Sequence, residues 1–295
     1  MHQSYIYQIF YDDLSKQNLD KGFIPLDNSS SEHPDWYEFW PILRFLRETP
    51  LNDGVWYGFL SPKFGTKTRL DSTMVYEFLQ RYSHADAAIF NAGWGQIAYF
   101  LNPFEQGDCW HPGLLDLSQE FVDYAGLDVD LSRLVTSSVT TVYANFIVAK
   151  AAYWREWMHI ANNLYSFCHD CGVSTATRIR SAANYTKNSS HLQMKVFIQE
   201  RLPSLVLSRM SLHVAGADIS NHANFPLEKE LFIDNFLSRR LLQSCDLLKQ
   251  YYCLTNEKDY LRMYYKLRNQ VPVTEFLQHF NARSAAAGDR GIAGS

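Results

Sequence analysis

The sequence predicts an α/β protein whose mostly parallel sheet is covered by helices. Short segments rich in aromatic and β-branched residues alternate with longer amphipathic segments in the first half of the chain, which is typical of strand–helix repeats. The chain has 295 residues, 46% of them apolar and 20% charged, enough to build a large buried core. The second half is mainly helical in pattern, so we expect an α/β domain at 1–210, a helical extension at 211–282 and a disordered or foreign tail at 283–295.

The elements of the first half follow from runs of apolar residues and from the residues that bound them. An aromatic run before Asp12 and Asp13 predicts the first strand. Asp35 is a suitable N-cap residue for one helix, and Asp71 or Ser72 for the next. The expected elements are strands at 5–11, 54–60 and 86–91 and helices at 36–48 and 72–81. Residues 22–35 and 63–72 are expected to form loops.

The rest of the chain begins with an irregular stretch at 93–113, rich in aromatic residues, Gly and Pro, which we expect to be a long functional loop. A strand is expected at 140–149. The expected helices are 114–125, 151–165, 193–209, 227–252 and 260–269. The last residues, 283–295, are rich in Ala, Gly and Ser and indicate a frayed end.

Several polar residues follow expected strands or begin helices, where open α/β sheets bind ligands. Asp27, Asn28 and Glu38 lie near a cluster of aromatic residues, a combination that suits sugar rings and their hydroxyl groups, although the tryptophans at 36 and 40 equally fit one buried helix face. Ser61 and Lys63 follow the second strand, and the lysine can neutralise a diphosphate or remain an ordinary surface residue.

The stretch 93–113 brings an amide, carboxylates and an imidazole close together in the sequence. Asn102 suits hydroxyl recognition, while Glu105 and His111 are candidates for general base catalysis. The alternative is a rigid Pro- and Gly-containing connection whose polar groups bond to its own backbone. Motifs for dinucleotide binding, P-loops, serine hydrolases and zinc proteases are absent from the sequence, so those classes have no specific support.

Four segments in order resemble the glycosyltransferase-like proteins of bacterial capsule and O-antigen loci. They are the acidic aromatic stretch 35–40 with the strand 57–64, the strand 86–90, the asparagine-containing stretch 143–150 with the tryptophan-bearing helix behind it, and the segment 196–202. The resemblance covers about residues 5–210, and the family includes members described only as a domain of unknown function. It implies a GT-A-like fold, a nucleotide-sugar donor and an oligosaccharide or lipid-linked saccharide acceptor in surface-polysaccharide synthesis.

The resemblance also implies roles for individual residues. Asn145 would lie beside the donor or acceptor sugar, and Glu200 would join Glu105 as a candidate base, although Glu200 equally suits a helix end. Arg178 and Arg180, with Lys63, would stabilise the departing phosphates. The expected chemistry is displacement of a nucleoside diphosphate from the anomeric carbon by an acceptor hydroxyl, with a carboxylate taking the proton.

The sequence departs from the family at the metal site. GT-A enzymes usually bind Mn²⁺ or Mg²⁺ through an Asp-x-Asp after a central strand, but here Asn91 follows that strand, where it is a candidate donor-binding residue instead. Asp128 and Asp130 form an Asp-x-Asp and are candidate metal ligands. They lie in an expected turn, where aspartates also serve as helix caps. Metal dependence and metal-independent action therefore both remain open, as does a non-catalytic carbohydrate-binding or assembly subunit.

Charge and cysteine content suggest the environment of the protein. The net charge of −4 offers no broad attraction for nucleic acid, and five cysteines, an odd number, favour reduced thiols in the cytoplasm. The sequence shows no signal-peptide pattern and no long uncharged apolar run, so we expect a cytoplasmic protein without a transmembrane segment. Peripheral contact with the inner face of the membrane is compatible with these features.

Overall fold

A computed structural model describes residues 3–30, 32–91, 93–183, 192–217, 231–233 and 235–288. Within them lies a six-stranded mixed sheet in the order β2-β1-β3-β5-β4-β8. Its strands are β1 (Ser4–Phe10), β2 (Ile24–Asp27), β3 (Trp56–Leu60), β4 (Ala87–Ile89), β5 (Ile147–Lys150) and β8 (Val214–Gly216). The short strands β6 (Ala182–Ala183) and β7 (Leu192–Gln193) form a separate antiparallel pair.

The direction of the strands brings one set of loops together. β5 is antiparallel to both β3 and β4, and every other pairing in the six-stranded sheet is parallel. The carboxyl ends of the five parallel strands and the start of β5 therefore meet at one edge of the sheet. This confirms a mostly parallel α/β fold and creates the kind of edge at which such sheets bind ligands.

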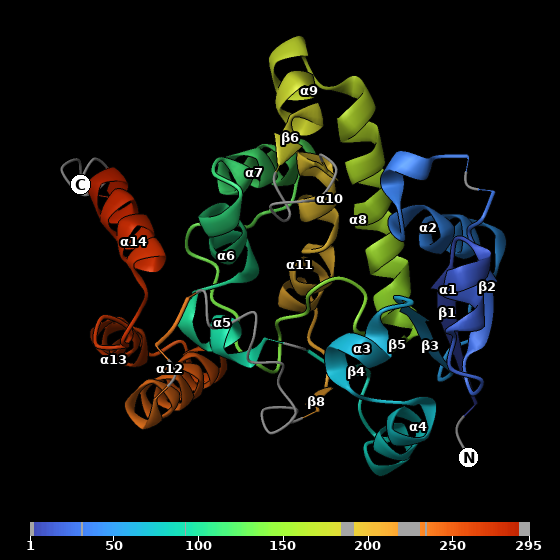
Figure 1. Cartoon of the computed structure of the whole chain (residues 1–295), viewed down its shortest axis with the longest axis horizontal. Helices are drawn as coiled ribbons and strands as arrows, with labels where there is room; N and C mark the ends of the chain where they lie inside the picture. The colour runs from blue at the N-terminus through green and yellow to red at the C-terminus, as the bar shows by residue number, and fades with distance from the viewer. Residues whose placement is uncertain are drawn as a thin grey trace.

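Helices surround this sheet and extend beyond it (Figure 1). Those before the C-terminal part are α1 (Asp13–Gln17), the 3₁₀ helix η1 (Pro34–Trp36), α2 (Phe39–Glu48), α3 (Phe64–Thr68), α4 (Ser72–Arg81), α5 (Trp94–Tyr99), α6 (Pro103–Trp110), α7 (Leu114–Tyr124), α8 (Ala151–Asp170), α9 (Val173–Arg180), α10 (Met194–Gln199) and α11 (Leu202–Arg209). The C-terminal helices are α12 (Phe236–Thr255), α13 (Lys258–Arg268) and α14 (Glu275–Gly288).

The main core lies between the sheet and the long helix α8. Trp154 and Trp157 of this helix are almost completely buried, and the indole Nε1 of Trp154 donates a hydrogen bond to the carbonyl of Tyr57 in β3 at 2.9 Å. Burying such large rings contributes several kcal/mol, of the order of 1.5–3 for each large apolar side chain. The helix and the central strand are thus fixed to each other.

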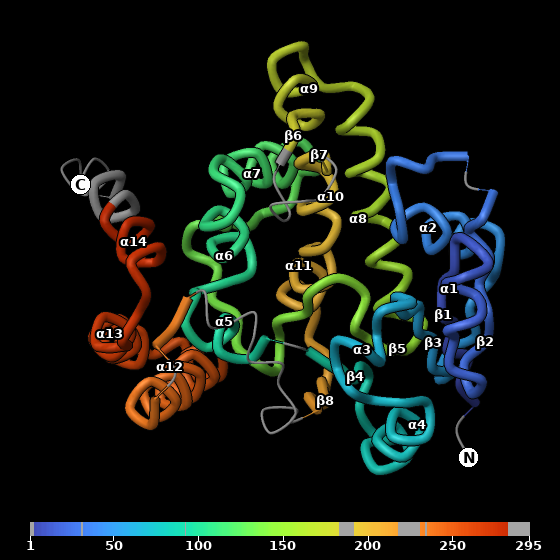
Figure 2. Tube along the Cα trace, viewed as in Figure 1, coloured from blue at the N-terminus to red at the C-terminus, as the bar shows by residue number. Residues whose placement is uncertain are grey.

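The C-terminal helices pack on α5 through a second apolar cluster, which includes Tyr99, Phe100, Leu242 and Leu277. Figure 2 shows α12 and α13 at one end of the molecule, far from β1 and β2. Rings of Tyr251 in α12 and Tyr260 in α13 stack with centroids 5.3 Å apart, so the two helices lie side by side. None of the described helices is both long enough and apolar enough to cross a lipid bilayer.

Several expected elements are confirmed with shifted ends. The helix expected at 72–81 is α4, and Asp71 caps it because its side chain accepts a hydrogen bond from the amide of Met74 at 2.9 Å. The helix expected at 36–48 starts later, at Phe39, because Tyr37 has a positive φ that interrupts the turn. The helix expected at 193–209 is divided into α10 and α11, with Pro203 in the first turn of the second.

Other expectations are wrong. Residues 93–113 contain the helices α5 and α6, and the loop expected at 63–72 contains α3. β2 lies in the loop expected at 22–35, and β8, inside the predicted helical extension, pairs with β4 in the main sheet. The predicted frayed end is helical as far as residue 288, while residues 289–295 and the start of the helix expected at 227–252 lie outside the described residues.

Candidate functional site

Polar side chains gather where β1, β2 and β3 end and where β5 begins. Tyr11 follows β1, Asn28 follows β2, Ser61 follows β3 and Asn145 precedes β5. The fifth member, Glu38, stands immediately before α2. These five residues, here called the Glu38 cluster, come from segments far apart in the sequence, and the parallel sheet brings their ends to one edge.

Glu38 is the centre of the cluster because its carboxylate is the shared acceptor. The amide Nδ2 of Asn145 donates to Oε2 at 3.0 Å, and the hydroxyl of Tyr11 donates to Oε1 at 3.4 Å. The Ser61 hydroxyl also bonds to this carboxylate. These donors orient the carboxylate and favour its charged form.

Two strained backbone positions flank this contact. Tyr37, just before Glu38, has φ 48° and ψ −127°, and Ala144, just before Asn145, has φ 52°. Non-glycine residues with positive φ are uncommon, and each such position costs of the order of 1–3 kcal/mol. The fold therefore maintains an unfavourable conformation on each side of the Glu38–Asn145 hydrogen bond, a pattern associated with functional sites.

A second carboxylate and a lysine lie within electrostatic reach of Glu38. Burial raises the pKa of Glu38, while the Ser61 hydrogen bond and the Lys67 charge oppose that rise. Burial also raises the pKa of Glu200, with Arg201 and Lys67 opposing and Glu38 adding to the rise. Both carboxylates are half-buried. The arrangement provides carboxyl groups that take up protons more readily than in water, beside one ammonium group.

Asn28 adds an acceptor that no protein group uses. Its Nδ2 donates to the carbonyl of Tyr37 at 3.3 Å, and its backbone amide donates to Phe10 at 2.8 Å. Its Oδ1 is buried and has no hydrogen-bond partner within the described structure. A buried carbonyl without a donor is costly, and a ligand hydroxyl beside the Glu38 cluster would satisfy it.

Asp27, the last residue of β2, and Lys63, in the loop after β3, both have exposed side chains. The Asp27 carboxylate accepts bonds from the amide and hydroxyl of Ser29, at 2.8 and 2.7 Å, and so forms a turn after β2. Lys63 is the residue before α3, the helix that carries Lys67. Among the described residues, neither side chain forms a hydrogen bond or an ion pair with Glu38.

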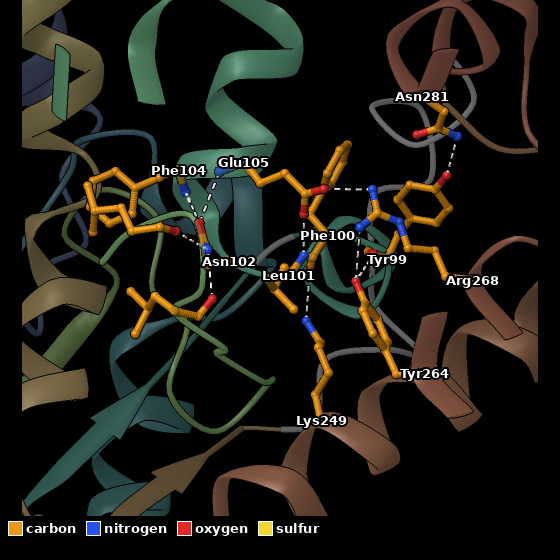
Figure 3. Close-up of polar contacts among 12 residues, drawn as sticks. Tyr99, Phe100, Leu101, Asn102, Phe104, Glu105, Lys249, Tyr264, Arg268 and Asn281 are labelled. Atoms are coloured by element: carbon orange, nitrogen blue, oxygen red, sulfur yellow. Dashed lines mark hydrogen bonds and ion pairs between the residues drawn. The ribbon is translucent and has the colours of Figure 1, made fainter. Parts of the chain in front are cut away.

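Glu105 and Asn102 lie elsewhere, at the junction with the C-terminal helices (Figure 3). Glu105 forms an ion pair with Arg268 of α13 at 2.7 Å and accepts a bond from the amide of Leu101 at 2.5 Å. Asn102 caps α6 through its Oδ1 and donates to two carbonyls of the loop after α7, those of residues 131 and 134. Glu105, a predicted base, is therefore bound by α13 and by its own backbone and has no described contact with the Glu38 cluster.

His111 is likewise part of the packing between helices. Its ring stacks on Phe197 of α10 with centroids 3.7 Å apart. Burial, followed by the nearby charge of Arg201, lowers its pKa to about 4, so the ring is neutral at neutral pH. Nδ1 of this ring is buried without a hydrogen-bond partner in the described structure.

The remaining candidates are dispersed. Arg178 is paired with Glu120, and Arg180 is exposed on α9. The carboxylate oxygen Oδ1 of Asp130 accepts bonds from the amide and the hydroxyl of Ser132, at 2.9 and 2.6 Å, and so forms a turn. Among the described residues, no group of three His, Cys, Asp or Glu side chains is arranged to hold a metal ion.

Asn91 lies at the other end of the same sheet edge, after β4. Its side chain bonds to the carbonyl of Thr141 and to the amide of Tyr143, and so holds the segment that leads to Asn145. It also lines a cavity of about 380 Å³ with residues of β4, β8, α5 and α12, including Trp94 and Asp246. The cavity and the Glu38 cluster thus lie on either side of one loop.

Two members of the site were not among the predicted site residues. Tyr11 was included only as the last aromatic residue of the first strand, and its position directly after a strand is the signal that could have selected it. Lys67 was expected only as one residue of the loop 63–72. Its position near Glu38 depends on α3, a helix that the polar sequence of this stretch did not predict. Comparisons with protein-family models, curated proteins and solved structures find no match to this chain.

Proposed function

We propose that the chain is a glycosyltransferase-like enzyme that transfers a sugar from a nucleotide-sugar donor to a saccharide acceptor, with Glu38 as the general base. The observation that carries the proposal is the Glu38 cluster: a half-buried carboxylate oriented by Asn145, Tyr11 and Ser61 at the carboxyl edge of the sheet. The resemblance to capsule and O-antigen transferases supplies the substrate class, and a GT-A-like arrangement is compatible with the mostly parallel sheet.

The properties of Glu38 suit proton transfer. Burial raises its pKa towards the working range of a general base, while three hydrogen-bond donors fix its direction. In the proposed reaction an acceptor hydroxyl forms a bond to the anomeric carbon and passes its proton to Glu38. The bond from that carbon to the donor phosphate breaks, and the nucleoside diphosphate leaves with the electron pair.

Lys67 and Asn28 have complementary roles in this proposal. The ammonium group of Lys67 interacts electrostatically with Glu38 and Glu200, and in this proposal it stabilises the charge that develops on the leaving diphosphate. The unpartnered Oδ1 of Asn28 accepts a sugar hydroxyl. Among the described residues, Asp128 and Asp130 do not join a third His, Cys, Asp or Glu in a group that could hold a metal ion.

The test begins with binding and proceeds to turnover. Thermal unfolding with UDP, GDP or CMP should show stabilisation by one nucleotide, about 2.7 kcal/mol when the ligand is present at about a hundred times its Kd. A panel of sugars on that nucleotide is then assayed for transfer and donor hydrolysis. Glu38→Gln should lower turnover by about 10²–10⁴-fold while the nucleotide-induced shift persists, because a general base acts on the acceptor.

The matched control is Glu156→Gln, a half-buried glutamate that pairs with Arg209 outside the Glu38 cluster. It should keep wild-type turnover. Lys67→Met should weaken the nucleotide-induced shift, because the proposed diphosphate contact is lost. Absence of any nucleotide-induced shift, or full turnover in Glu38→Gln, would contradict the proposed enzyme. Saccharide binding without a nucleotide effect would instead support a carbohydrate-binding subunit.

A further inference from the structure

Helix α12 carries large apolar side chains on the side turned away from the protein as well as on the side turned inward. The side turned into the protein carries Ser238, Asp246 and Lys249 as well as Leu242 and Cys245. The opposite side carries an exposed row of large apolar residues at helical spacing, here called the apolar stripe: Phe236, Leu247, Tyr251 and Leu254. Because several large apolar side chains occupy solvent positions on this side, it has the character of an interaction surface.

The exposure of the stripe is large. Phe236 is 74% exposed and Leu254 is 81% exposed, and Leu247 and Tyr251 lie between them on the same side of the helix. A 20-residue helix is about 30 Å long, so the stripe extends along much of one edge of the molecule. Leu247, Tyr251 and Leu254 follow one another on the last turns of the helix, whereas Arg240 and Gln243 separate them from Phe236. Grouped exposed apolar side chains mark interaction surfaces, whereas single exposed residues do not.

The charge around the stripe identifies the chemistry of the surface that would cover it. In residues 236–268 the exposed charged side chains are five Lys and Arg and two Asp and Glu, because Lys249, Arg268 and Asp246 are buried, whereas the whole chain has a net charge of −4. Arg240 lies within the row and its guanidinium is 5.1 Å from the centroid of the Phe236 ring. Arg239 is also exposed on α12, and Lys258, Arg262 and Lys266 are exposed on the neighbouring helix α13, where Arg262 pairs with Asp259. This excess of positive charge favours an anionic surface.

The position of α12 in the molecule indicates which kind of surface covers the apolar stripe. α12 and α13 lie at the outer edge of the structure, so the stripe is on a protruding helix (Figure 1). A protruding helix with large apolar tips and flanking Lys and Arg is the form that interfacial membrane helices take, with the apolar side chains among the acyl chains and the cations at the headgroups. We propose that α12 docks the protein on an anionic lipid bilayer through the apolar stripe.

The proposal is tested by co-sedimentation of the full chain with lipid vesicles. Wild-type protein should pellet with phosphatidylcholine vesicles that contain phosphatidylglycerol, and much less with pure phosphatidylcholine. Added salt should weaken binding, because exposed cations contribute part of the attraction. The double variant Leu247→Glu, Leu254→Glu should bind at least about tenfold more weakly, since two apolar anchors become anionic.

The control is Leu14→Glu, which changes another exposed leucine, on α1, and should leave vesicle binding unchanged. Thermal unfolding verifies that each variant is folded. The proposal is overturned if the wild type remains in the supernatant with anionic vesicles at low salt, or if the double variant binds as the wild type does. A wild-type dimer in light scattering that Leu254→Glu dissociates, without vesicle binding, would show that a second copy covers the stripe.

Discussion

The buried ammonium of Lys249 should make the stability of the protein depend on pH in a predictable direction. Its side chain is fully buried and donates to the carbonyls of Ile97 and, at 2.6 Å, Phe100, at the C-terminal end of α5. Burial lowers its pKa from 10.5 to about 8, with Asp246 and Glu105 opposing that change. The lysine therefore caps a helix end, but at the cost of placing a charge away from water.

The sign follows from proton binding. Between the folded pKa near 8 and the unfolded pKa of 10.5, the unfolded chain holds more protons, so the free energy of unfolding rises with pH. The shift corresponds to about 3 kcal/mol over the whole window, and to about 2 kcal/mol between about pH 7.5 and about pH 9.5. Lys249→Met removes the titrating group and with it this contribution.

The assay is urea unfolding of wild type and Lys249→Met at several pH values across that range. The free energy of unfolding of the wild type should gain about 2 kcal/mol relative to the variant as the pH rises. Lys266→Met, which removes an exposed lysine of α13, should show the same pH dependence as the wild type. Parallel curves for wild type and Lys249→Met would refute the reasoning, because they would show that Lys249 does not titrate differently in the folded state.

Three further substitutions test other features. Gly107→Ala would place a Cβ 2.4 Å from a leucine side chain and 2.5 Å from a buried guanidinium. It should lower the free energy of unfolding in urea by about 1–3 kcal/mol. The control Gly172→Ala, which has open space around its Cβ, should not lower it. Arg268→Met leaves the largely buried Glu105 carboxylate unpaired and should cost about 3–5 kcal/mol in urea unfolding; a neutral result would contradict a structural ion pair. Tyr37→Gly relieves a positive φ and should raise the melting temperature by an amount equivalent to about 1 kcal/mol, while a lower value would show that the backbone is not strained there.

The sequence was sufficient for the elements that have strong local signals. The buried strands β1 and β3 are aromatic or β-branched runs, and α4 has both an apolar period and a capping aspartate. It was insufficient where tertiary packing overrides local preference. The helices α5 and α6 contain Gly, Pro and aromatic residues, and they are held by Lys249 and Arg268 from elements more than a hundred residues away.

The same distinction explains the candidate site. Ser61 and Glu38 could be selected because they lie at the end of an expected strand and at the beginning of an expected helix, whereas Asn28 was selected for its aromatic neighbours in an expected loop and Asn145 through the family resemblance. Their assembly could be anticipated only as a general property of parallel sheets. Glu105 was a reasonable candidate by composition, but its partner Arg268 lies in a helix whose position the local sequence does not encode.

The loop between the cavity and the Glu38 cluster acts as a short tether between two parts of the protein. At one end, Ser138 bonds through its amide and hydroxyl to Asp246 of α12, at 2.8 and 2.6 Å. At the other end, Asn145 bonds to Glu38. Between these two ends, Asn91 bonds to the loop at Thr141 and Tyr143, and the amide of Ala144 donates to the carbonyl of Glu200 at 2.9 Å. The amide that orients the proposed base is therefore positioned mainly by the sheet and by α10, and removing the C-terminal extension would take away the Ser138 anchor while leaving the supports next to Asn145 in place.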